Sequence, residues 1–257
     1  MKKVYVFLIF VIFGIGIIMF LLFGLDSVRR EKYETVLVVS DDTTWIYQNK
    51  GWLHVSSADQ YNELNWQKYH VFEDNKSIGS YDLWHDDKWY IFDDSKNAIM
   101  ANGTWFGYKS NYEIEVENFS KEEISEDGYV ISVLNDKGLP LDNKYTTSYK
   151  SSVDIDKDGI IEDFYVISNV FASGDHPKKT FSFVFMVKDN QIYYLYDDVR
   201  EYKAYSGCVP DIIAFLDADD DQVDELVVSC GQYSNLGRID MLYNFDGEKF
   251  KILISNQ

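Results

Sequence analysis

The sequence is poor in proline, cysteine and histidine: its 257 residues include three prolines, two cysteines and four histidines. So few prolines, together with 15 glycines, exclude collagen-like and proline-rich architectures. Basic residues are also scarce, with 24 lysines and arginines against 43 acidic residues, and the formal charge is −19. This charge argues against nucleic acid as a partner, because binding to a phosphate backbone needs a basic face. The chain is nevertheless 46 % hydrophobic and 17 % aromatic, which is typical of a protein that folds around a core.

Catalytic motifs are also missing from the sequence. It contains no nucleophile elbow, no phosphate-binding loop and no CxxC pair. Carboxylates are so numerous that a glycosidase pair cannot be singled out by counting. The histidines, which show no metal-site spacing, are His54, His70, His85 and His176. We therefore expect a protein that is not an enzyme.

The one long hydrophobic run lies near the N-terminus. Residues 4–25 contain no charged side chain, and as a helix they would span roughly 33 Å, enough for a hydrocarbon core of about 30 Å. The residues after the run, Phe23 to Ser27, offer no small-x-small cleavage site, and no cysteine is near for lipoprotein processing. The sequence thus predicts a signal-anchor transmembrane segment within residues 1–30, with a cleaved signal peptide as the alternative.

The rest of the chain has the periodicity of strands. Residues 181–187 place three phenylalanines and a valine on one face, and the turn at 188–191 leads into a second strand at 192–196. Similar hairpins are predicted within 45–55, 83–92 and 241–254. One short helix is predicted after Ser120, because Ser120 and Glu123 have capping-box spacing. The expected fold is all-β, with antiparallel hairpins or meanders that form an incomplete propeller-like structure or a sandwich, preceded by one transmembrane helix.

Tryptophan is confined to one part of the chain. All six tryptophans precede residue 106, whereas both cysteines and the ordered acidic clusters follow residue 150. This asymmetry predicts a tryptophan-rich β region at 36–119 and a second β region at 127–257. The indoles are expected to pack in the core and across strands, and the alternative is an exposed aromatic platform for sugar rings. They belong to Trp45, Trp52, Trp66, Trp84, Trp89 and Trp105.

Two acidic segments place carboxylates at positions 1, 3, 5 and 9. The first begins at Asp154, and the second begins 63 residues later at Asp217. Calcium takes six to eight oxygen ligands at about 2.3–2.6 Å, which a tightly curled loop of alternating carboxylates supplies. Neither segment is an EF-hand, because position 12 holds Tyr165 or Val228 and the flanking residues have the pattern of strands. A solvated acidic turn is the alternative.

These segments resemble the calcium loops of FG-GAP and VCBS-type repeats, whose pattern is D-x-D-x-D-G-x-x-[DE] before an aliphatic strand. The resemblance implies a loop that binds calcium between two strands of a propeller-like sheet. The 63-residue offset fits one blade, but residues 36–257 hold only about three and a half such units, too few for a seven-bladed propeller. The C-terminal pattern also looks like that of membrane-anchored proteins from low-GC Gram-positive bacteria. The implied ligands are Asp154, Asp156, Asp158, the Ile160 carbonyl and Glu162, then Asp217, Asp219, Asp221, the Val223 carbonyl and Glu225.

Each loop departs from that pattern once. Gln222 stands where the second loop should have its turn glycine, which would cost about 1 kcal/mol if that position needs a positive φ. Asp163 replaces the aliphatic residue that should follow the first loop. We therefore expect the first loop to be the stronger calcium site.

Cys208 and Cys230 flank the second acidic loop. If the strands on its two sides pair as a hairpin, the two cysteines come close to facing each other. An oxidising compartment would then favour a disulfide, and two buried free thiols are the alternative.

The lysines and arginines around the hydrophobic run leave its orientation nearly balanced under the positive-inside rule. We place residues 31–257 outside the cytoplasm, because loops of this kind work where calcium is near millimolar. The sequence thus predicts a single-pass membrane protein whose β domain binds calcium and contacts an unknown protein or an envelope polysaccharide. The alternative is a polysaccharide-binding or carbohydrate-active accessory protein of the cell envelope.

Overall fold

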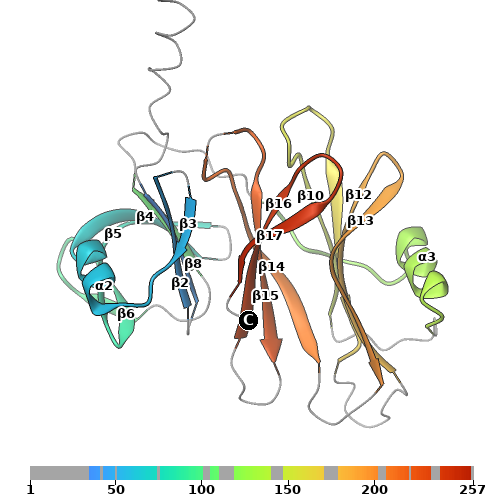
Figure 1. Cartoon of the computed structure of the whole chain (residues 1–257), viewed down its shortest axis with the longest axis horizontal. Coiled ribbons are helices and arrows are strands. Elements are labelled where there is room, and N and C mark those ends of the chain that lie inside the picture. Colours follow the sequence, from blue (N-terminus) through green and yellow to red (C-terminus); the bar gives the residue numbers. More distant parts are fainter. Residues whose placement is uncertain are drawn as a thin grey trace, which may run out of the picture. The chain divides into compact units, whose positions relative to one another are not determined.

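The structure is a computed structural model (Figure 1). It describes residues 35–40, 43–49, 51–73, 76–100, 105–109, 119–139, 147–170, 179–201, 207–219, 221–232 and 238–255. Residues 33–257 form one compact unit. The predicted transmembrane segment lies outside the described residues, and among the latter no helix is long and apolar enough to cross a membrane.

Strands from the first part of the chain form an eight-stranded antiparallel sheet, sheet A. Its strands are β1 (Thr35–Ser40), β2 (Thr43–Gln48), β3 (Gly51–His54), β4 (Gln67–Glu73), β5 (Lys76–Asp86), β6 (Lys88–Phe92), β7 (Ala98–Met100) and β8 (Trp105–Lys109). They lie in the order β3-β2-β1-β8-β4-β5-β6-β7. Helix α2 (Ala58–Leu64) joins β3 to β4 and begins at a capping box in which Ser57 and Gln60 exchange side-chain-to-backbone hydrogen bonds.

The later strands form two antiparallel meanders, sheets B and C. Sheet B contains β9 (Glu122–Glu123), β10 (Thr147–Val153), β11 (Glu162–Ser168), β12 (Lys179–Lys188) and β13 (Gln191–Glu201), in the order β13-β12-β11-β10-β9. Sheet C contains β14 (Cys208–Leu216), β15 (Glu225–Gln232), β16 (Arg238–Phe245) and β17 (Phe250–Ser255), in chain order. The predicted antiparallel all-β class is confirmed.

The predicted hairpins are confirmed in both later sheets. In sheet B, β12 and β13 pair from Lys188 opposite Gln191 onward, and Phe181, Phe183 and Phe185 are buried on one face as their spacing predicts. Helix α3 (Gly128–Asp136) covers that face with Val133 and Leu134 (Figure 1). In sheet C, β16 turns at residues 246–249 into β17.

The predicted helix after Ser120 is wrong. Glu122 and Glu123 instead form β9, which pairs with β10 at the edge of sheet B. The helix of this region begins at Gly128, where the Asp127 side chain caps the N–H groups of residues 129 and 130. Pairing with β10 therefore determines the conformation of this segment, and the capping-box spacing of Ser120 and Glu123 does not produce a helix here.

Sheet C packs against another sheet on each of its two faces. One face packs against sheet B, where Phe215 and Leu226 meet Phe164. The other packs against sheet A, where Val227 and Leu242 belong to the same apolar cluster as the β1 and β8 side chains. The outer face of sheet A is covered by α2 and that of sheet B by α3. The result is a stack of three sheets, close to the predicted sandwich but with one layer more.

The sheets divide the chain near the predicted boundary between 36–119 and 127–257. Sheet A is built from residues 35–109, and sheets B and C are built from residues 122–255. The two parts share one apolar core across the interface between sheets A and C. They therefore belong to a single folding unit.

Candidate metal-binding loops

The two acidic loops occupy the same place in the two meanders. The first acidic loop (residues 154–162) connects β10 to β11, and the second acidic loop (residues 217–225) connects β14 to β15. In each case the glutamate at position 9 is the first residue of the strand that follows. Both glutamates are buried, with 0 % and 1 % of their surface exposed. The loops are therefore counterparts within the two meanders.

The two loops also share their hydrogen bonds, counted from Asp154 or Asp217 as position 1. The position-1 carboxylate accepts the N–H groups of positions 5 and 6, at 3.1 and 3.0 Å in the first loop and 3.1 and 3.3 Å in the second. The position-5 carboxylate accepts the N–H of position 7, at 2.8 Å in both. The position-9 glutamate accepts the N–H of position 2, at 3.0 and 2.8 Å. The two loops thus adopt the same hydrogen-bonded conformation.

Position 6 has a left-handed backbone in both loops. Gly159 has a φ of 87°, and Gln222 has a φ of 74°. Glycine adopts this conformation without a steric penalty, whereas glutamine at the same position costs about 1 kcal/mol. The second loop therefore keeps the turn in spite of its missing glycine, at a small cost in stability.

Carboxylates converge in both loops at a spacing that suits calcium. One oxygen each from Asp154, Asp156 and Glu162 lie within 4.8 Å of one another, and the same holds for Asp217, Asp219 and Asp221. Two oxygens on opposite sides of a calcium ion lie about 4.8 Å apart, twice a metal–oxygen distance of about 2.4 Å. The carboxylates brought together in this way can surround one ion of that size.

In the first loop a lysine ammonium already lies among the carboxylates. Lys188, the last residue of β12, places Nζ 3.0 and 2.8 Å from the two oxygens of Asp156, 3.0 Å from Asp158 and 2.7 Å from Glu162. Burial disfavours the charged form of Lys188, but its hydrogen bonds to these carboxylates prevail and raise its pKa. The same contact lowers the pKa of Asp158. The repulsion among the negatively charged first-loop carboxylates is therefore offset by a lysine of the same chain.

In the second loop an asparagine takes the place of that lysine in the strand register. Val187, just before Lys188, pairs with Asp163, which directly follows the first loop. Tyr243 pairs in the same way with Leu226, which directly follows the second loop. The residue after Tyr243 is Asn244. A neutral amide therefore stands in β16 where β12 has an ammonium.

The second loop concentrates negative charge. Asp219, Asp221 and Glu225 form no ion pair with a lysine or arginine within the described part of the chain. Burial, together with the neighbouring carboxylates Asp221 and Asp217, raises the pKa of Asp219 to about 6. Burial likewise raises the pKa of Glu225 to about 9, with Asp219 adding to the effect. A bound cation would reduce the electrostatic repulsion among these carboxylates.

The two loops contact each other directly. The Asp224 N–H donates to the Ile155 carbonyl at 2.8 Å, and Lys157 Nζ lies 3.0 Å from the Asp224 carboxylate. Lys157 thus belongs to the first loop but binds an aspartate of the second. The two acidic loops therefore lie side by side at one end of sheets B and C.

The remaining sequence-predicted positions lie in or beside the loops. Ile160 and Val223 occupy position 7 and donate their N–H groups to the position-5 carboxylates, and their carbonyl oxygens stay predicted ligands. Asp163, the departure after the first loop, accepts a hydrogen bond from Ser152 at 2.6 Å and lies 3.4 Å from Lys150 Nζ. It therefore stabilises the β10–β11 pair and takes no part in the cluster of carboxylates.

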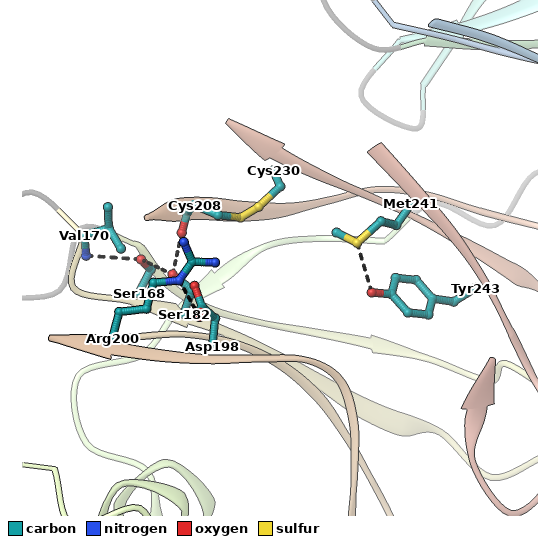
Figure 2. The surroundings of a disulfide bond; sticks show 9 residues. All are labelled: Ser168, Val170, Ser182, Asp198, Arg200, Cys208, Cys230, Met241 and Tyr243. Carbon is teal, nitrogen blue, oxygen red and sulfur yellow. Dashed lines mark hydrogen bonds and ion pairs between the residues drawn. A yellow bond between two sulfur atoms is a disulfide. The ribbon is translucent and has the colours of Figure 1, made fainter. Parts of the chain in front are cut away.

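Cys208 and Cys230 form a disulfide across β14 and β15 (Figure 2). Their Cα atoms lie 5.3 Å apart, but they are diagonal neighbours, because Cys230 pairs with Pro210 and not with Cys208. Beneath them Ser182 of sheet B donates to the Cys208 carbonyl. The bond thus closes the open end of the hairpin whose other end carries the second acidic loop, at a point where sheets B and C meet.

Three of the tryptophans lie in the core, in agreement with the expectation that the indoles pack in the core and across strands. Trp45, Trp89 and Trp105 are no more than 6 % exposed, and Trp89 Nε1 donates to the Thr44 hydroxyl at 2.8 Å. Trp66 is the opposite case, with 56 % of its surface exposed. The sugar-platform alternative therefore depends on Trp66 and its neighbours and not on Trp89.

Two of the histidines have structural contacts. His70 Nδ1 hydrogen-bonds with the Ser80 hydroxyl at 2.7 Å. The His85 ring stacks on Tyr61 with 3.7 Å between ring centroids, and burial lowers the pKa of His85. His176 lies outside the described residues. These contacts are those of packing residues in a β protein.

Sequence reasoning missed Lys188 because the residue was assigned to turn chemistry between β12 and β13. The only available signal was a lysine directly after a buried strand, where alternation places it on the face of Met186. Its relation to the first loop depends on the pairing of β11 with β12.

Comparison with known proteins adds no relative: no family model matches the chain, and neither a curated protein nor a solved structure is similar to it.

Proposed function

We propose that this chain is a single-pass, membrane-anchored protein whose extracytoplasmic β domain binds calcium at the second acidic loop and serves interaction or adhesion without catalysis. The observation that carries the proposal is the pair of equivalent loops. The first folds around a cationic group, Lys188 Nζ, and the second repeats its hydrogen bonds with an asparagine in the register position of that lysine. A calcium ion would supply positive charge to the carboxylates of Asp219, Asp221 and Glu225, which form no ion pair with a lysine or arginine among the described residues.

The fit to calcium follows from the donor set. Asp217, Asp219 and Asp221 offer hard carboxylate oxygens at the right mutual distance, and the predicted Val223 carbonyl and Glu225 would extend the shell toward the six to eight oxygens that calcium takes. Magnesium demands a tighter octahedral shell and should bind less well.

The location outside the cytoplasm rests on two chemical arguments. Sites of this kind in extracellular modules bind calcium with dissociation constants of about 10⁻⁴–10⁻³ M, which suits millimolar calcium. The Cys208–Cys230 disulfide also persists where the compartment is oxidising. The hydrophobic run at residues 4–25 would hold the domain at the membrane.

Calcium is expected to raise the midpoint of thermal unfolding of the full chain in mild detergent. At a few millimolar the gain should be on the order of 1 kcal/mol, because the free calcium then exceeds the dissociation constant several-fold. Asp219→Asn should abolish the gain, whereas Asp156→Asn in the first loop should retain it. The measurement is differential scanning calorimetry in EDTA, calcium or magnesium. A wild-type melting curve that does not respond to calcium would contradict the proposal.

A second candidate function, binding of envelope polysaccharide, is favoured by Trp66. This exposed residue has a φ of 60°, a conformation that is rare for a bulky side chain and costs of order 1–3 kcal/mol. The turn is fixed because Trp66 N–H donates to the Leu83 carbonyl at 2.7 Å and Asn65 Oδ1 accepts the His85 N–H at 2.7 Å. Strain at a residue that is not buried points to a role other than stability.

Trp66 extends an aromatic surface formed with Trp84 of β5 and Phe92 of β6. Its ring lies 6.1 Å from Trp84, at an interplanar angle of 26°, and 5.3 Å from Phe92. Lys96 lies over the indole and pairs with Asp82 at 2.5 Å. An apolar platform with charged groups at its rim suits a sugar ring, which has an apolar face and a rim of hydroxyls.

Binding to immobilised glycans on an array is expected to disappear in Trp66→Ala. Leu53→Ala is the matched control, because Leu53 is also an exposed apolar side chain of sheet A. Array binding that survives Trp66→Ala, or no binding by the wild type, would remove this candidate.

A further inference from the structure

The two acidic loops differ in one respect that their sequences do not reveal. Their carboxylates lie at the same four positions and make the same backbone hydrogen bonds. The strand beside each loop differs, however, with Lys188 at the end of β12 and Asn244 in β16. The difference therefore comes from outside both loops.

The position of Lys188 is well defined. Its side chain is 12 % exposed, and its Nζ lies within 3.0 Å of three carboxylates. One of these, Glu162, has no exposed surface. An ammonium with three carboxylate partners occupies the space in which a metal ion would meet the same oxygens.

We infer that Lys188 decides which loop takes the metal: its ammonium serves as a built-in counter-ion that keeps calcium out of the first loop, whereas Asn244 leaves the second loop open to it. This inference rests on the function proposed for the second loop. It reverses the ranking expected from the sequence, in which the intact D-x-D-x-D-G pattern favours the first loop.

If the inference is right, exchanging the two residues should change the number of calcium ions bound per chain. Lys188→Asn places beside the first loop the same residue that lies beside the second, and it should raise the number of calcium ions per chain from one to two. Asn244→Lys gives the second loop the neighbour of the first, and it should lower that number from one to none. Since Asn244 is only partly buried, this second variant tests the inference even where Lys188→Asn impairs folding.

The experiment is equilibrium dialysis of the full chain in detergent against radioactive calcium, with unfolding monitored in parallel. The additional ion of Lys188→Asn should vanish when Asp156→Asn is added, which assigns it to the first loop. If the wild type binds one calcium, a count that stays at one in Lys188→Asn, or at one in Asn244→Lys, would overturn the inference.

The wild type separates the inference from the proposed function. Two ions per wild-type chain, one of them lost in Asp156→Asn, would overturn the role of Lys188 and leave calcium binding by the second loop intact. No ion in the wild type but one in Lys188→Asn would support the role of Lys188 and contradict the proposed function.

Discussion

Replacing Lys188 with methionine is expected to lower the free energy of unfolding by about 3–5 kcal/mol in calcium-free buffer. The variant keeps an apolar stem of similar length but removes the ammonium from Asp156, Asp158 and Glu162. Removing one partner of a buried ion pair leaves the other charge without compensation, which costs about 3–5 kcal/mol. Urea-induced unfolding monitored by tryptophan fluorescence gives the value.

The control for this variant is Lys68→Met. Lys68 and Asp94 also form an ion pair, at 2.8 Å, but their side chains are 53 % and 86 % exposed. Exposed pairs contribute about 0–1 kcal/mol, because water screens them. Equal losses for the two variants would mean that Lys188 stabilises the first loop no more than a surface lysine does. Relative to the wild type in the same calcium buffer, the loss of stability should be smaller than in calcium-free buffer for Lys188→Met and unchanged for Lys68→Met.

Loss of the Cys208–Cys230 disulfide is expected to cost about 3 kcal/mol. The two cysteines are separated by 22 positions, and in the chain-entropy model a closed loop of that length restricts the unfolded chain by about that amount. Urea-induced unfolding of wild-type protein, with and without dithiothreitol, measures the difference. The double variant Cys208→Ala with Cys230→Ala should match the reduced protein and be insensitive to dithiothreitol.

The native redox state can be established separately. Cys208 and Cys230 are only 3 % and 0 % exposed, so an alkylating reagent reaches them only after unfolding. Protein purified without a reducing agent should therefore be denatured in the presence of the reagent and analysed by mass spectrometry. Alkylation of both thiols would show that the protein carries no disulfide in its own compartment.

Local patterns predicted the strands well, because burial and turn chemistry act within a few residues. The alternation of Phe181, Phe183 and Phe185 and the turn after Lys188 are both local, and β12 and β13 formed as expected. The capping-box spacing at Ser120 and Glu123 led to a wrong prediction because it is also a local pattern. It contains no information about strand β10, which is distant in the sequence and pairs with this segment.

The site was predictable only as two separate loops. Carboxylate spacing and the glycine or glutamine at position 6 are local properties, and the loop conformation follows from them. The position of Lys188 depends on the register of β11 with β12, and the contact of Asp224 with Ile155 depends on the packing of two sheets. Neither can be read from spacing along one segment. Trp66 likewise gave no signal, since its exposure depends on hydrogen bonds to strand β5.

The middle position of sheet C has a consequence for the order in which the protein can fold. Its strands come from residues 208–255, after all the strands of sheets A and B. A chain that emerges from the ribosome or the translocon up to residue 207 presents one apolar face of sheet A and one of sheet B with nothing to cover them. Both cores are completed only when the final four strands arrive. The domain can therefore complete its folding only after residues 208–255 have been synthesised, and a chain truncated before residue 208 should aggregate.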